Sequence, residues 1–468
     1  MLSTIFTYEW KKFSRSKGLL GAMFVFFAIG LFSLQQGKAI YQFQQISIDS
    51  ATVKKVRNYQ KVKSIFDTLT YNTKQRSSIE QAFMIEWRLG DVVSKNPSPL
   101  SILSIGQSDI YSPLLSGHFN KDIFKNDFTE FQNPEKLLAG NLDVSFYILF
   151  LFPLLLLALS YNVQSADKEA GISPLLNTQA NAPGKIIHLR LLFRWLMALV
   201  PVLLISLVSY IYMSSLPNFS IVSFFQWWGI ALLYAIFWLV VVAIIQRFCF
   251  SSLISAITLA GIWVLLLVAI PGLLNTWFNY QYPSNNKTAI AEYRDYDNIA
   301  WDKPMSSHKK FLFSNYPQLQ KDSAKLDSNN IRSFSYSLQV FNREQELYTS
   351  IAKNKKEQAA SEENSFWINP VGGVMRSFAI ICNSSLQQQQ QFEQSVLDYR
   401  LQKLQHIYEN QLLQPHFTKQ DFEALPKYKA PIQNNKYFHF LFPLLVLGLV
   451  LGISGSAISL QKNKNNNV

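Results

Sequence analysis

The sequence has little charge and almost no cysteine. Of its 468 residues, 16% are charged, against about 25% in an average soluble protein. The two cysteines, Cys249 and Cys382, provide no framework of bridges and so exclude a disulfide-stapled secreted domain. The apolar residues gather in runs that are too long for soluble helices. This distribution also excludes a soluble enzyme and a disordered chain.

Motifs for catalysis and for metal binding are missing as well. The six histidines are scattered, without HExxH or a Cys–His cluster, so no metal site is predicted. No GxSxG nucleophile motif occurs. Gly184-Lys185 lacks the rest of a phosphate-binding loop, so we expect no ATP binding through a Walker motif. The chain is therefore not expected to be an enzyme or to hold a cofactor of its own.

The net charge of +13 does not by itself indicate nucleic-acid binding. The basic residues flank apolar runs or are scattered through polar stretches, and no long basic arm is present. Basic residues on the cytoplasmic flanks of spans are typical of membrane proteins. We therefore expect membrane lipid, and not nucleic acid, as a partner.

Six segments have about the length and apolar character needed to cross a bilayer. They are residues 18–34, 144–161, 195–213, 225–245, 252–271 and 437–458. The first segment is short, but its leader is long and no small-residue cleavage site follows. We therefore interpret it as an uncleaved signal-anchor. The predicted fold class is an all-α polytopic membrane protein with six transmembrane helices.

The distribution of Lys and Arg in the short loops predicts how the chain is oriented. Basic residues precede the first span, separate the second span from the third and follow the sixth, whereas the short loop 214–222 has none. The positive-inside rule then places residues 1–17, 162–194 and 459–468 in the cytoplasm. Both termini are therefore expected to be cytoplasmic.

The two long polar segments, 35–143 and 272–436, fall on the opposite side, where long loops are nearly exempt from the rule. Leu397, Leu401 and Leu404 recur at helical spacing in the second segment. We therefore expect two large, mainly helical extracytoplasmic insertions.

The leader 1–17 has an amphipathic pattern of its own. Leu2, Phe6, Trp10 and Phe13 recur at spacings of four, four and three residues, and Glu9 falls on another face. This stripe predicts a helix that lies in the membrane interface before the first span. The alternative is a polar leader with randomly placed aromatic residues.

The sixth predicted span carries small residues at intervals of four, Gly448, Gly452 and Ser456. Small side chains on one helix face allow two backbones to approach closely, so this spacing predicts tight packing on another helix. The alternative is that glycine is simply common in membrane helices.

The loop between the second and third spans carries an ordered pattern. It begins with Asp167-Lys168-Glu169-Ala170-Gly171-Ile172 and continues with Leu175-Leu176. An acidic residue, then Glu, any residue and Gly, followed by a leucine-rich segment, resembles the permease subunits of ABC type-2 exporters. Two further segments are similar to a branch of these permeases with enlarged outer loops. They are Gly106-Gln107-Ser108-Asp109-Ile110-Tyr111, with prolines at 97, 99 and 113, and Ala291-Glu292-Tyr293-Arg294.

The resemblance implies a transport subunit in a bacterial cytoplasmic (inner) membrane. Two permease chains, identical or different, would pair, and each would dock on a separate ATP-binding subunit that binds ATP and Mg. Asp167, Glu169, Gly171, Leu175 and Leu176 would couple the permease to that subunit. The residues of the loop alone leave equally open an ordinary connector whose charges only fix topology.

A second function remains open at this point. The chain could be a non-transporting membrane anchor or sensor, whose outer insertions bind an envelope ligand or partner. A secondary carrier is disfavoured, because the spans hold almost no ionisable residues.

Overall fold

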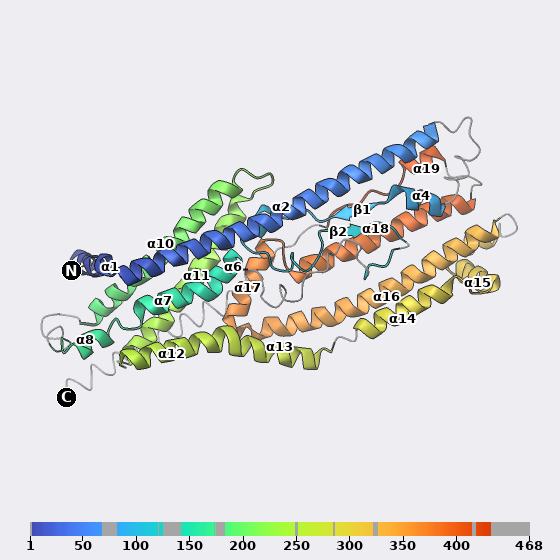
Figure 1. Ribbon diagram of the computed structural model, residues 1–468. Coiled ribbons are helices and arrows are strands. Elements are labelled where there is room, and N and C mark those ends of the chain that lie inside the picture. Colours follow the sequence, from blue (N-terminus) through green and yellow to red (C-terminus); the bar gives the residue numbers. More distant parts are fainter. Residues whose placement is uncertain are drawn as a thin grey trace.

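The computed structural model describes residues 2–67, 82–119, 121–124, 142–172, 174, 183–248, 251–283, 286–321, 326–413 and 418–431. These residues are mainly helical (Figure 1). The one sheet among them pairs β1 (Val92–Ser94) with β2 (Leu114–Ser116) in antiparallel register, with Val93 opposite Leu115. The structure thus agrees with the predicted all-α class.

The helices fall into an apolar group and a more polar group. The apolar group is α1 (Leu2–Arg15), α2 (Lys17–Asp67), α6 (Val144–Phe146), η2 (Tyr147–Leu151), α7 (Phe152–Ser160), α8 (Ser165–Glu169), α10 (Pro183–Met213), α11 (Ile221–Arg247), α12 (Ser252–Val264), η3 (Leu265–Ala269) and α13 (Ile270–Gln281). The other group is α4 (Ala82–Leu89), η1 (Pro99–Ile102), α14 (Asn286–Ala300), α15 (Met305–Asn315), η4 (Pro317–Gln320), α16 (Ser328–Asn364), η5 (Ser365–Trp367), α17 (Pro370–Ile381), α18 (Leu386–Leu413) and α19 (Lys419–Glu423). Within it, η1 and α17 are apolar exceptions, and their buried residues belong to the core of the apolar group.

Five helical stretches in the described residues are long and apolar enough to cross a membrane. They are Lys17–Asp67, Val144–Glu169, Ile186–Met213, Ile221–Arg247 and Ser252–Gln281. These stretches coincide with the first five predicted spans, and together they form a bundle. The sixth predicted span, with Gly448, Gly452 and Ser456, lies outside the described residues.

Two of these stretches contain a π-helical turn before a proline, at η2 and η3. Pro153 has no N–H, so the carbonyl of Leu149 loses its usual helical donor. The hydroxyl of Tyr234 on α11 replaces that donor, at 2.8 Å from the Leu149 oxygen. Trp263 on α12 similarly donates its Nε1–H to the carbonyl of Phe150, at 3.1 Å. Side chains from neighbouring helices thus satisfy the backbone inside the bundle, where water is not available.

The first span does not end where the first insertion was predicted to begin. Helix α2 continues without a break from residue 17 to residue 67, a length of 51 residues or about 77 Å. Buried residues continue along one face of the helix, at Leu34, Tyr41 and Ile48. The polar run after Leu34 therefore marks a change of surroundings and not the end of a helix.

The polar helices form a second region at the far end of the molecule (Figure 1). This region consists of the second half of α2 with α4, β1, β2, α14–α16, α18 and α19, and we call it the distal domain. Its core combines residues of both predicted insertions. These include Val62, Phe66, Ile85 and Phe119 from the first and Leu312, Phe334, Phe341, Leu404 and Tyr408 from the second. The two insertions therefore form one folded unit.

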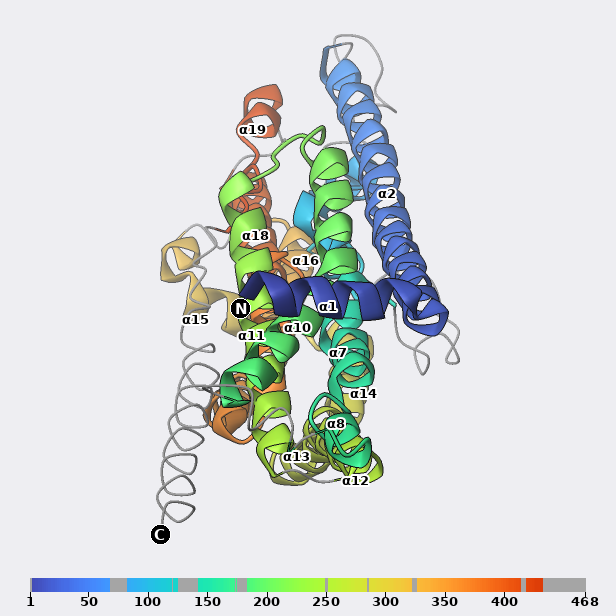
Figure 2. The ribbon, with the colours of Figure 1, turned by 90° about the vertical axis from the view of Figure 1, so that its left-hand side faces the viewer.

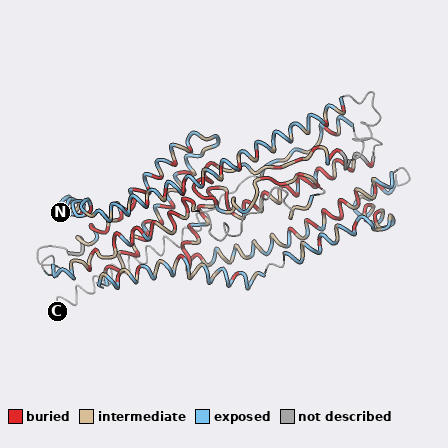
Figure 3. Tube along the Cα trace, in the orientation of Figure 1, coloured by how far each residue is buried: buried red, intermediate tan, exposed pale blue. Residues whose placement is uncertain are grey.

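One helix lies across the bundle at each of its ends. Helix α1 crosses α10 at the end opposite the distal domain (Figure 2), and we call this the α1 end. Helix α17 packs on α11 at the other end, and Val371, Val374 and Phe378 belong to the same core cluster as the spans. Buried residues run along the middle of the molecule, whereas the outer faces of α2 and α12 are exposed (Figure 3).

Candidate functional site

The α1 end of the bundle contains the predicted coupling residues. Helix α1 sits on α10 through Phe6 and Phe13, whose ring centroids lie 5.4 and 6.4 Å from that of Phe193. Trp10, which was predicted on the same face, points away and is exposed. The side chain of Glu9 takes the inward position instead and is buried. The predicted apolar stripe of α1 is therefore only partly the packed face.

Glu9 is buried because two arginines on α10 meet it. Its Oε1 lies 2.9 Å from Nε of Arg190, and its Oε2 lies 3.6 Å from Nε of Arg194. These arginines are four residues apart, so they lie on one face of the helix. Arg190 also makes an ion pair with Asp167 of α8. Arg190 thus joins α1 and α8, which are distant in sequence and both lie beside the spans.

Gly171 ends α8 in the way that its residue type predicts. Its φ is +71°, in the left-handed region that favours glycine. The N–H of Gly171 donates to the carbonyl of Lys168 at 3.1 Å, and that of Ile172 donates to the carbonyl of Asp167 at 3.0 Å. This pair of bonds is a Schellman motif, which satisfies the free carbonyls at a helix end. Gly171 therefore forms a tight turn at the end of α8.

Glu169 binds the N-terminus of α12. Its Oε1 accepts from the backbone N–H of Ser252 at 2.7 Å, and its Oε2 accepts from the Ser252 hydroxyl at 2.8 Å. The first N–H groups of a helix lack partners within the helix and favour a negative charge. Ser165 of α8 adds a third contact, between its Oγ and that of Ser252 at 2.9 Å. Helix α8 is thus fixed to the start of the fifth apolar stretch.

Gln246 near the end of α11 completes this end of the bundle. Its Nε2 donates to the carbonyls of Ser160 and Tyr161, at 3.0 and 2.7 Å, and its Oε1 accepts from the N–H of Gln164 at 3.3 Å. One amide therefore satisfies backbone groups on both sides of the joint between α7 and α8.

The structure brings Asp167, Glu169 and Gly171 together in one short helix and its turn. Leu175 and Leu176 lie outside the described residues, and the coupling role of all five stays a prediction. Sequence reasoning missed Ser252 as the partner of Glu169, and it missed Glu9 as a second partner of Arg190, which binds Asp167. An acidic residue between Phe6 and Phe13 was the available signal for Glu9, but such a residue is equally typical of a polar face.

The motif segments of the two insertions are structural joints. Gly106 has φ +53° and approaches Ser384, whose carbonyl accepts from the N–H of Gln107 at 2.9 Å. In the second segment, Tyr293 is buried, and Arg294 pairs with Asp122 of the first insertion at 3.1 Å. Both motifs therefore connect one insertion to the other.

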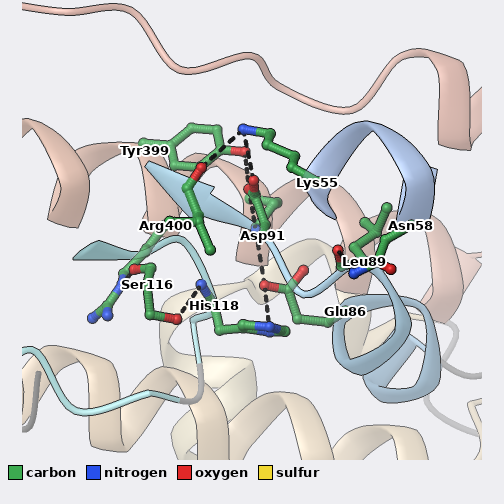
Figure 4. A network of polar contacts seen from close by, with 11 residues as sticks. Lys55, Asn58, Glu86, Leu89, Asp91, Ser116, His118, Tyr399 and Arg400 are labelled. Carbon is green, nitrogen blue, oxygen red and sulfur yellow. Dashed lines mark hydrogen bonds and ion pairs between the residues drawn. The ribbon is translucent and has the colours of Figure 1, made fainter. Parts of the chain in front are cut away.

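A second polar site lies inside the distal domain, where charged side chains meet around Asp91 (Figure 4). Nζ of Lys403 lies 2.8 Å from Oε1 of Glu86 and 3.0 Å from Oδ2 of Asp91, and Nζ of Lys55 lies 2.8 Å from Oδ1 of Asp91. Burial alone would raise the pKa of Asp91, but the charges of Lys403 and Lys55 lower it well below its usual range. Asp91 is therefore ionised within the fold.

A neighbouring pair joins Arg400 to Glu344, with Nη1 3.2 Å from Oε1. Burial raises the pKa of Glu344 to about 7, and the charge of Arg400 offsets part of that effect. We call ionic cluster the set of Lys55, Glu86, Asp91, Glu344, Arg400 and Lys403. Its members come from both insertions, and no local motif in the sequence indicates it.

Part of the second predicted insertion matches a described protein family. A family model described as a domain of unknown function (DUF3526) matches residues 287–430. No curated protein and no solved structure matches the chain. The matched segment begins in α14 and ends after α19, so it covers nearly all of the second predicted insertion.

Proposed function

We propose that this chain is the permease subunit of an ATP-driven ABC transporter of the exporter type. One observation supports the proposal above the others. Helices α1 and α8 are joined to each other through Arg190, and α8 is joined to α12 through Glu169. Short polar contacts thus connect two peripheral helices to the ends of two apolar ones, α10 and α12.

This arrangement is suited to a loop that transmits the movement of an ATP-binding partner to the spans. A displacement of α8 would carry Asp167 and Glu169 with it, and so would move the starts of α10 and α12. ATP binding by a partner can bias the spans only if the partner contacts their two arrangements differently. In the proposed mechanism, Asp167 and Glu169 hold α8 on the bundle. The exposed turn at Gly171 and Ile172, with Leu175 and Leu176 beyond it in the sequence, meets the partner.

The proposal includes the partners and the location that the sequence resemblance implies. A separate ATP-binding subunit would bind ATP and Mg, and a second permease chain, identical or different, would complete the pathway. The α1 end would face the cytoplasm of a bacterium, and the distal domain would lie outside the inner membrane. The Lys and Arg in the short loops support this orientation.

Site-specific crosslinking in native membranes tests the proposal. A photo-crosslinking residue replaces Ile172, which is exposed beside the α8 turn. The matched control carries the same residue in place of Tyr280, exposed at the end of α13. We expect the position-172 probe to capture a polypeptide with Walker motifs and the position-280 probe not to. Failure to capture such a subunit from position 172, with intact expression, would contradict the proposal.

A non-transporting anchor or sensor is the second candidate, and one feature favours it. The DUF3526 match falls on the second insertion, where a groove of about 540 Å³ lies between α14, α15 and α16. The groove is lined by the side chains of Tyr296, Ile299 and Phe311 and by the carboxylates of Glu292 and Asp295. ATP-dependent movement of a substrate by the purified complex in vesicles would separate transport from this alternative.

A further inference from the structure

Helix α17 differs from its neighbours in the second insertion because it belongs to the apolar bundle. Phe378 stacks on Trp227 of α11, with ring centroids 4.2 Å apart. Trp227 lies six residues from the start of α11 at Ile221, or about 9 Å along the helix. Part of the second insertion thus packs beside α11, past the first turns of that span.

The turn before α17, and one position within the helix, carry large apolar side chains that are exposed in the part of the chain that the structure describes. Ile368 and Met375 are 63% and 58% exposed, and Trp367 of η5 is 49% exposed. Trp367 and Ile368 come just before α17, which begins at Pro370, and Met375 lies within it. Such exposure of large apolar side chains beside one another calls for an apolar environment.

The single charged residue of α17, Arg376, is bound by α16. Arg376 donates from Nη2 to Oε1 of Glu363 at 2.7 Å and from Nη1 to the carbonyl of Ala359 at 3.3 Å. Both acceptors lie on α16. The charge of α17 is therefore directed toward the distal domain, as expected for a helix at the boundary between lipid and water.

A matching stripe lies on α13. Leu273, Trp277 and Tyr280 are exposed at intervals of four and three residues. The stretch to which they belong starts at Ser252, and about 20 residues cross the hydrocarbon core of a bilayer. The stripe therefore begins where the hydrocarbon ends, at the level at which Trp and Tyr are enriched in membrane proteins.

A hydrogen bond holds the end of α13 close to the segment before α17. Oη of Tyr282, just after α13, lies 2.7 Å from Oγ of Ser361 near the end of α16. Residue 361 comes just before η5 and α17, and Figure 1 shows α13 running beneath α16. The exposed side chains of α13, of the turn before α17 and of Met375 thus continue the exposed apolar surface of the apolar helices.

We propose that this surface, the outer aromatic surface, binds phospholipid of the membrane leaflet next to the distal domain. It consists of Leu273, Trp277, Tyr280, Trp367, Ile368 and Met375. Acyl chains cover Leu273, Ile368 and Met375, and the aromatic rings lie at the level of the headgroups. Helix α17 is then an interfacial helix, and it holds the distal domain against the membrane.

Nitroxide labels test this proposal. The full-length chain is labelled and placed in vesicles of phosphatidylethanolamine and phosphatidylglycerol. Cys249 is replaced by Ser in every variant. The Cys249→Ser protein without an added cysteine measures how much label reaches the buried Cys382. Cysteine then replaces Met375 or, as a second position, Tyr280. Ile299→Cys is the control, because Ile299 is apolar and 61% exposed but lies at the end of α14 in the distal domain.

The readout is the collision of each label with oxygen, which enters lipid, and with a nickel chelate, which stays in water. We expect labels at 375 and 280 to favour oxygen and the label at 299 to favour the chelate. Equal chelate access at 375 and 299 would overturn the proposal. Shielding of 375 and 280 from both reagents would also overturn it, in favour of a protein cover. The measurement needs no ATP-binding partner, so it is independent of the permease proposal.

Discussion

The interiors of the bundle and of the distal domain are built from different side chains. Inside the bundle, buried aromatic residues such as Trp238 and Phe152 fill the space, and the charged contacts lie at the α1 end. Inside the distal domain, Lys403, Arg400, Glu86 and Glu344 are each 1% exposed and are paired with one another or with Asp91. One region is specified by shape and the other also by charge.

The difference follows from how each region is assembled. Apolar helices in a membrane associate mainly through close packing, because lipid is as apolar as their side chains. The distal domain joins segments that are far apart in the sequence, for example Asp91 and Lys403. Since a buried ion pair seldom adds much stability over apolar packing, we interpret the ionic cluster as a device that fixes how the two insertions fit together.

The strongest test of this contrast is to remove one charge from the ionic cluster. Lys403→Met leaves the carboxylates of Glu86 and Asp91 buried with less compensation, which costs about 3–5 kcal/mol in comparable cases. We expect a marked fall in the thermal unfolding midpoint in detergent and a loss of protease resistance in the distal domain.

Lys419→Met is the matched control, because Lys419 pairs with Asp67 at the surface, where both side chains are nearly half exposed. Surface pairs contribute little, so no measurable change is expected. If the two variants behave alike, the ionic cluster does not stabilise the distal domain and the contrast fails.

The next test concerns the junction between the two regions. At Gly37 in α2, a Cβ would overlap the carbonyl of Ile102 in η1. Overpacking of this kind typically costs about 1–3 kcal/mol, so Gly37→Ala should lower the unfolding midpoint. At Gly21 in the same helix, a Cβ would meet no atom within 4 Å. Gly21→Ala should therefore leave the midpoint unchanged or raise it, and equal effects of the two changes would contradict this account.

A third test uses pH to separate the regions. The pKa of Glu344 in the fold is about 7, above the value of about 4.3 for a free side chain. The folded state therefore binds this proton more tightly, so its contribution to stability is complete at low pH and is lost as pH rises from about 4.3 through 7. The lowered pKa of Asp91 acts only in more acidic solution.

We therefore expect Glu344→Gln to flatten the dependence of the unfolding midpoint on pH between about 5 and 8. The variant also leaves Arg400 without its charged partner, so its midpoint should be lower throughout. The slope is the diagnostic quantity. An unchanged slope would show that Glu344 does not titrate differently in the fold.

The sequence predicted the bundle better than the distal domain, for a physical reason. A span is a local property of about 20 residues, so hydropathy alone located the five apolar stretches. The turn at Gly171 is also local, because only its own backbone demands glycine. The pairs of Lys403 and the contacts of Glu9 join distant segments, and nothing in a local pattern distinguishes them from solvated charges. The length of α2 escaped prediction because a polar run does not end a helix that packs on a new neighbour.

The smallest expected effect on stability, and the sharpest on function, is at the α1 end. Gly171→Val places a branched side chain at φ +71°, which costs about 1–2 kcal/mol. A Cβ at this position would meet no atom within 4 Å, so the change is conformational and not a clash. Gly171→Asn is the matched control, because Asn tolerates left-handed backbone.

Neither variant touches the core, so the strain in the Val variant should open the turn after α8 and leave the unfolding midpoint of the bundle close to that of the wild type. On the permease proposal, the Val variant should lose stimulation of the partner ATPase and the Asn variant should retain it. If both retain it, the turn after α8 is not the point where motion enters the bundle, and the polar contacts of this end serve only to hold α8 in place.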